Sequence, residues 1–165
     1  MSAPGITLLE LLDDNERSAE KWRHWFTENP AALELPCSIY DSGTVRGLLK
    51  HIFAVELRHS QRLMDHPVTA YDAIPAGAFE LLFEVHEQAV RNLRQFLAGA
   101  DMTTLEEIIR LQTVSAGTLQ ASRRKLFVHI MFHSMRHWAQ LSTVLREAGF
   151  KTEWHKDFLF SDAIV

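Results

Sequence analysis

Apolar residues recur at spacings of three and four along most of the chain, and this periodicity predicts four long amphipathic helices. The first is expected over about residues 7–26, and the second from near Ser42, as its N-cap, to about residue 63. The third is expected over about residues 76–98 and the fourth over about residues 122–148, with Gly149 as its C′ residue. Long helices joined by short connections are typical of an all-α four-helix bundle.

Residues 100–121 lack the clear helical spacing of the rest. A helix over residues 105–113 is one interpretation, but the β-branched content and partial alternation of residues 108–114 favour a strand. Ser115-Ala116-Gly117 is a turn signal before a returning segment, so we expect a short hairpin before the last helix. The aromatic residues after position 150 indicate that the segment docks on the body or on a partner chain. We therefore expect one domain over residues 1–165, with a C-terminal tail at 150–165.

The composition is that of an ordinary soluble domain, with 47% hydrophobic and 23% charged residues among 165. A net charge of −4 argues against a nucleic-acid partner, and we interpret the basic run 123–125 as a solvated face. No apolar stretch approaches the roughly 18–20 residues of a membrane span. Cys37 is the only cysteine, which excludes an internal disulfide and a cysteine-based zinc site. The N-terminus does not resemble a signal peptide, so we expect a cytoplasmic protein.

Two histidines on the predicted fourth helix are the most informative feature of the chain. His133 and His137 are four residues apart, which places both imidazoles on the same helix face. That face also carries the apolar stripe that should be buried. Ionisable rings in a core cost free energy unless something satisfies them, and a metal ion is a common partner for two imidazoles. The spacing therefore predicts two ligands of a metal site.

A third ligand is expected from another helix, and His51 is the best candidate because it lies among apolar residues on the second helix. Three neutral imidazoles leave at least one coordination position open, which is typical of a catalytic site. Imidazole ligands suit zinc, nickel, copper or iron about equally, so ligand type alone does not choose the metal. Zinc or nickel is the metal that we expect.

Other histidines are alternatives to this set. His86 lies on the inward stripe of the third helix and competes as a ligand, and His59 is a weaker competitor. His129 precedes His133 by one turn, but one helix rarely supplies three ligands to one ion, so a supporting or structural role is favoured.

Glu56 is the one catalytic candidate beyond the histidines. With His59 it forms a Glu-x-x-His element like that of di-iron bundles, but the predicted fourth helix has no glutamate before Glu147, which disfavours di-iron chemistry. Glu56 could instead orient a ligand histidine or carry a proton, and a solvated or ion-paired role is the alternative. Two roles are equally plausible for Gln140: a hydrogen bond near the ligands, or packing in the core.

Two segments resemble the DinB/YfiT-like family of metalloenzymes. The first, residues 44–56, is similar to the family's leucine-rich helix that leads into a ligand histidine. The second, residues 129–141 followed by 145–149, resembles the family's H-x3-H-x3-H-x2-Q pattern and its Arg-x-x-Gly helix end. The chain differs from the common pattern at Arg136, Trp138 and Ala139, and these changes leave the three predicted ligands intact.

The resemblance implies a four-helix bundle in which His51 meets His133 and His137 on one divalent ion, and it implies a homodimer. It also implies a metal-dependent transferase that uses a low-molecular-weight thiol and acts on a small molecule. A hydrolase is the alternative enzyme, and a non-catalytic metal-binding or stress-associated protein is the alternative outside enzymes.

Overall fold

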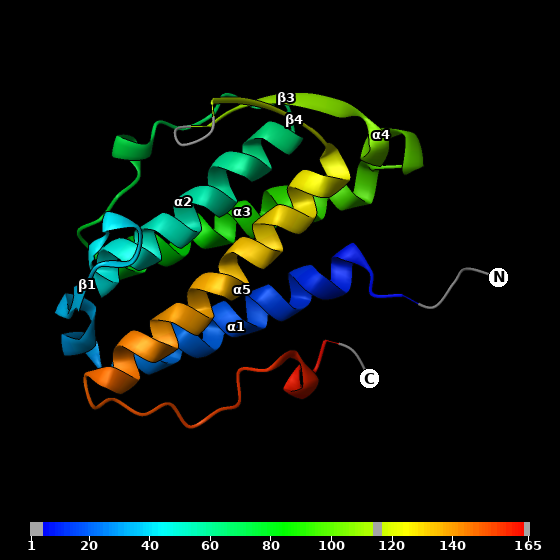
Figure 1. Ribbon diagram of the computed structural model, residues 1–165. Coiled ribbons are helices and arrows are strands. Elements are labelled where there is room, and N and C mark those ends of the chain that lie inside the picture. Colours follow the sequence, from blue (N-terminus) through cyan, green and yellow to red (C-terminus); the bar gives the residue numbers. More distant parts are fainter. Residues whose placement is uncertain (1–4, 114–116, 164–165) are drawn as a thin grey trace.

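The computed structural model describes residues 5–113 and 117–163, and its body consists of helices (Figure 1). Four of these are long: α1 (Leu8–Glu28), α2 (Val45–Leu63), α3 (Phe79–Gly99) and α5 (Arg123–Glu147). A short helix, α4 (Met102–Glu106), follows α3. Helix α2 packs against α3 and α5, and α1 packs against the same two helices, so the four enclose a common core. The mostly helical architecture agrees with the all-α class expected from the periodicity.

Local side-chain chemistry sets most helix ends. Thr7 closes a capping box with Glu10 at the start of α1, and the Ser122 side chain accepts a hydrogen bond from Lys125 N at the start of α5. After α5, Gly149 adopts φ +85°, a left-handed conformation that glycine reaches without strain. The expected end of the last helix is thus correct.

The starts of α2 and α3 differ from the prediction. The N-cap of α2 is Thr44 rather than Ser42, because residues 43–44 are extended in a short strand and the Thr44 side chain accepts from Gly47 N. Helix α3 begins at Phe79 rather than near residue 76, and no side chain caps its first turn.

Two small antiparallel pairs of strands accompany the helices. β1 (Pro36–Cys37) pairs with β2 (Gly43–Thr44) directly before α2. β3 (Ile108–Thr113) pairs with β4 (Gly117–Ser122) in the hairpin before α5, so the strand interpretation of this segment holds. Ser115 and Ala116 of the expected turn lie outside the described residues. Short 3-10 turns occupy the connections and the tail, at Pro30–Glu34, Ile39–Asp41, Tyr71–Ala73 and Phe158–Phe160.

The apolar core forms two clusters. One contains Trp22, Phe26 and Phe53, and the other contains Leu12, Leu93 and Phe127. Each long helix contributes a buried polar residue near the boundary between the clusters: Asn15, Glu56, His86 and Ser134. Buried polar groups cost free energy unless they are hydrogen-bonded, so their partners decide what this layer does.

The basic run at the start of α5 is only partly solvated. Arg123 is buried and donates hydrogen bonds to Leu63 O at 2.6 Å, to Asp65 at 2.8 Å and to Glu107 at 2.7 Å. It thereby satisfies a carbonyl at the C-terminal end of α2. The interpretation of this run as a solvated face is therefore wrong for Arg123, while Arg124 is exposed.

The C-terminal tail lies along the body beside α1 and α5 (Figure 1). The Trp154 and Trp22 ring centroids are 4.9 Å apart, those of Phe150 and Trp25 are 5.8 Å apart, and Trp25 Nε1 donates to Lys151 O at 3.1 Å. The tail thus docks on the body through α1. Among the described residues, none of the helices combines the length and apolar character that crossing a membrane requires.

Candidate metal centre

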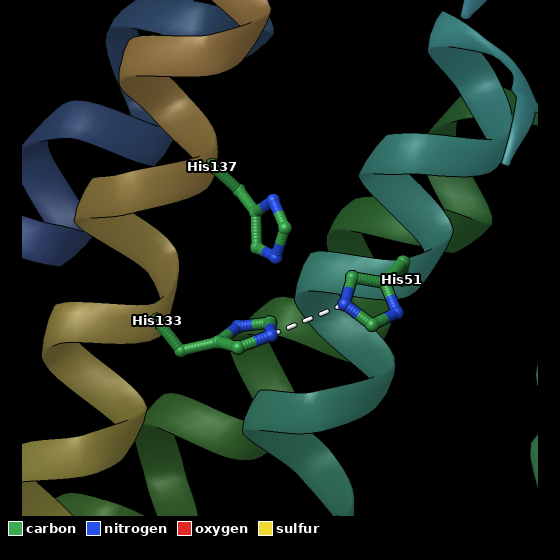
Figure 2. Close-up of side chains that lie close together, drawn as sticks. All are labelled: His51, His133 and His137. Carbon is green, nitrogen blue, oxygen red and sulfur yellow. Dashed lines mark hydrogen bonds between the residues drawn. The ribbon is translucent and has the colours of Figure 1, made fainter. Parts of the chain in front are cut away.

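Three histidine side chains from two helices point toward one another in the seam between α2 and α5 (Figure 2). His51 comes from the middle of α2, and His133 and His137 come from successive turns of α5. All three are buried, and His51 Nε2 lies 3.1 Å from His133 Nε2. One ring nitrogen from each residue lies within 4.8 Å of the other two. The structure therefore brings together the three residues that the sequence singled out.

The three rings are held in their neutral form. Burial, followed by His137 and Arg136, lowers the pKa of His51 to about 4. Burial and the neighbouring histidines lower the pKa of His133 to about 2, and burial together with Arg136 lowers the pKa of His137. A histidine must be neutral to bind a metal, so the site keeps its ligands in the competent state near pH 7.

The hydrogen bonding of these rings fits a metal ion. Both ring nitrogens of His137 and Nδ1 of His133 are buried without a hydrogen-bond partner in the structure. Nitrogens bound tetrahedrally at about 2.0–2.1 Å lie roughly 3.4 Å apart, and the His51 Nε2 to His133 Nε2 distance of 3.1 Å is close to that value. The unpaired nitrogens, the spacing and the neutral donor set are all compatible with a divalent metal.

Tyr40 covers part of this centre, although it lies in the connector before α2. Its ring centroid is 4.2 Å from that of His51 and 6.5 Å from that of His137. The side chain is nevertheless 62% exposed, so the ring touches both the ligands and solvent. Sequence patterns did not single out Tyr40, because a connector residue has no periodicity that would show which way it faces.

Glu56 does not join the three histidines but lies deeper in the core. One carboxylate oxygen accepts from Asn15 Nδ2 at 2.8 Å and from Ser134 Oγ at 2.7 Å, and the other lies 2.6 Å from His86 Nδ1. A single side chain of α2 thus bonds to α1, α3 and α5. Burial alone would raise the pKa of Glu56, but His86, Asn15 and Ser134 together lower it. Of the roles expected for Glu56, the ion-paired one matches this placement.

His86 is the partner of Glu56 rather than a neighbour of the three-histidine cluster. Burial opposes its charge, but the Glu56 carboxylate outweighs burial and raises the pKa of His86. Both pKa shifts favour an imidazolium paired with a carboxylate in the bundle core. Asn15, which interrupts the apolar stripe of α1, also accepts from Trp138 Nε1 at 3.3 Å, so Trp138 faces the core.

The remaining candidates lie around the centre. His59 and His129 pack ring to ring at 5.6 Å, one turn along the seam, and His129 lies 5.8 Å from His133. Among the described residues, neither belongs to the group with metal-binding spacing. The side-chain oxygen of Gln140 is buried without a hydrogen-bond partner, but the Gln140 side chain acts on His137 in the direction that raises the pKa of that ring, so both roles expected for Gln140 stay open.

A comparison with protein-family models shows which family the chain belongs to. The model of the DinB family matches residues 1–163, which is essentially the whole chain. The chain belongs to the DinB family. Searches of the curated proteins and of the solved structures gave no match. Membership of the DinB family and a buried three-histidine cluster compatible with metal binding are thus two independent findings.

Proposed function

We propose that this DinB-family protein binds one divalent metal, zinc or nickel, through His51, His133 and His137, and that it is a transferase using a low-molecular-weight thiol. The observation that carries the proposal is the cluster of three neutral, buried imidazoles with one nitrogen each within 4.8 Å of the others, in which His133 and His137 also have buried ring nitrogens without a hydrogen-bond partner. When bound there, a divalent ion would supply Lewis acidity that favours the thiolate form of a thiol.

The protein's own residues favour an anion at the centre. The three ligands are neutral, so they leave the charge of a dication uncompensated. Arg136 acts electrostatically on all three rings. A cation that disfavours protonated histidine also favours a thiolate over a thiol. This field supports thiol chemistry, and it adds to burial, which is the larger cause of the lowered pKa values of the three histidines.

A metal-dependent hydrolase is less well supported. Hydrolysis at such a centre generally uses a side-chain base within hydrogen-bond reach of the attacking water. Among the described residues, no carboxylate joins the three-histidine group. Glu56 is committed to Asn15, His86 and Ser134 in the core. The transferase is therefore the better hypothesis, with a small-molecule substrate and a homodimer as its expected setting.

Thiol binding to the cobalt-substituted protein tests this function, because a thiolate on Co²⁺ gives a charge-transfer band in the near ultraviolet. Titration with 2-mercaptoethanol should produce this band in the wild type but not in His137→Ala. When an electrophile is added as well, the metal-loaded protein should consume the thiol, and the metal-free protein should not. If the cobalt-loaded wild type shows no band with any small thiol, the transferase proposal should be abandoned.

A further inference from the structure

The connector that carries Tyr40 has an unusual backbone. Tyr40 and the following Asp41 both have positive φ, at 53° and 52°. This left-handed region is uncommon for residues other than glycine, and it is especially unfavourable for a bulky side chain such as tyrosine. Strain of this kind persists only where the surrounding structure imposes it, and it is often found at functional sites.

Close packing against α2 imposes this conformation. A Cβ atom added at Gly47, in the first turn of α2, would lie only 2.0 Å from the Ser42 carbonyl oxygen. Only glycine allows this approach, although glycine weakens a helix. Ser42 Oγ also donates to Cys37 O at 3.1 Å, and β1 pairs with β2 on either side of the loop. The loop is therefore fixed on α2.

Gly47 and His51 are four residues apart and share one helix face. A loop seated at Gly47 consequently reaches the next turn, where the Tyr40 ring lies against His51 at a centroid distance of 4.2 Å. The strained backbone at Tyr40 and the glycine at position 47 therefore have the same result: they place the exposed Tyr40 ring next to His51.

We infer that Tyr40 contacts the bound thiol, its exposed ring beside His51 forming an aromatic wall against which the carbon body of the thiol packs. This inference rests on the proposed function and adds a substrate class to it: thiols that carry an apolar or aromatic group near the sulfur. The Tyr40 ring is suited to this role because it is held by His51 and is still 62% exposed. Aromatic contacts strengthen binding by a modest, measurable factor.

The test compares an aromatic and a small thiol on the cobalt-substituted protein. Benzyl mercaptan and 2-mercaptoethanol are titrated into the wild type and into Tyr40→Ala, Tyr40→Phe and Gly47→Ala. Tyr40→Ala should bind benzyl mercaptan about three- to tenfold more weakly, with 2-mercaptoethanol nearly unchanged. Tyr40→Phe keeps the ring and should resemble the wild type. Gly47→Ala should resemble Tyr40→Ala, since its Cβ displaces the loop.

Phe132→Ala is the matched control. Phe132 is similarly exposed at 56% and lies on the ligand-bearing helix α5. The Phe132→Ala substitution should leave the affinities for both thiols unchanged. Cobalt uptake, read from the d–d absorption of each variant, shows whether the centre itself is intact. If Tyr40→Ala retains cobalt and binds benzyl mercaptan as tightly as the wild type, or more tightly, the inference about Tyr40 is wrong although the proposed function stands. If the wild type binds cobalt but neither thiol, the proposed function itself is contradicted, and the inference about Tyr40 falls with it.

Discussion

Single residues in the core of this protein carry charge that the apolar surroundings oppose. Glu56 is 1% exposed and His86 is 5% exposed, yet the two are 2.6 Å apart and bond as an ion pair. A buried pair of this kind contributes little net stability by itself, but removing one partner is strongly destabilising, because the other charge stays buried. The pair should therefore make its own contribution to the pH dependence of stability, which a comparison between wild type and a variant of the pair isolates.

The pKa shifts of Glu56 and His86 determine how stability changes with pH. The lowered pKa of Glu56 gives stability that is complete above its ordinary value of 4.5 and is lost as pH falls through the lowered pKa. The raised pKa of His86 gives stability that is complete below its ordinary value of 6.5 and is lost as pH rises through the raised pKa. Together they stabilise the folded chain most between these two limits.

Glu56→Gln should abolish both contributions. We expect the free energy of unfolding near pH 6 to fall by about 3 kcal/mol, with a smaller loss at either extreme of pH. Urea denaturation of the metal-free protein from pH 4 to 9 measures the difference between variant and wild type. Glu87→Gln, which removes a partly exposed partner of Arg23, is the control and should cost under about 1 kcal/mol. A constant difference across the pH range would show that the pair is not ionised.

At the scale of elements, Ser134 links the two helices that carry the histidines. It lies between His133 and His137 on α5 and bonds to Glu56 on α2, the helix of His51. Ser134→Ala should weaken metal binding up to about tenfold, because the bond to Glu56 holds α5 against α2 and so helps to set the spacing of the ligand histidines. Ser60→Ala is the control, because the Ser60 side chain bonds to Asn92 between α2 and α3 and not to the Glu56 carboxylate. Competition with a chromophoric chelator measures both. Equal affinities in the two variants would mean that Ser134 serves stability alone.

The junction of α2, α4 and α5 depends on Arg123. Its buried guanidinium bonds to Leu63 O, Asp65 and Glu107. Arg123→Ala should lower the free energy of unfolding by about 2–4 kcal/mol, since hydrogen bonds to a charged group are among the strong ones. The adjacent Arg124→Ala loses only an exposed pair with Glu106 and should cost under about 1 kcal/mol. If chemical denaturation shows similar losses in the free energy of unfolding for both variants, the bonds of Arg123 do not stabilise this junction.

For the molecule as a whole, the sequence was most informative where contacts are local. The four-residue spacing of His133 and His137 reports a shared helix face, and Ser122 and Gly149 mark both ends of α5 because capping is a property of neighbouring residues. The third histidine, His51, needed the apolar neighbours on α2 and the family resemblance. Helical spacing and the family resemblance together were therefore enough to predict the three histidines of the site.

Residues whose role depends on distant partners could not be predicted in the same way. The bonds of Glu56 join residues 30 to 78 positions apart, so no local pattern shows them. Arg123 looked solvated because its partners at Leu63 and Asp65 are distant in sequence. Tyr40 depends on how closely a loop approaches Gly47, which only the folded backbone specifies. The homodimer expected from the resemblance stays a prediction.

Metal content is the most direct test of the central claim. Elemental analysis of the protein, purified without an affinity tag after metal-replete growth, should give one divalent ion per chain. His51→Ala and His133→Ala should lose it, and His24→Ala, which removes an exposed histidine of α1, should retain it. Absence of metal from the wild type, or its retention in both ligand variants, would contradict the account and leave the three histidines as structural residues.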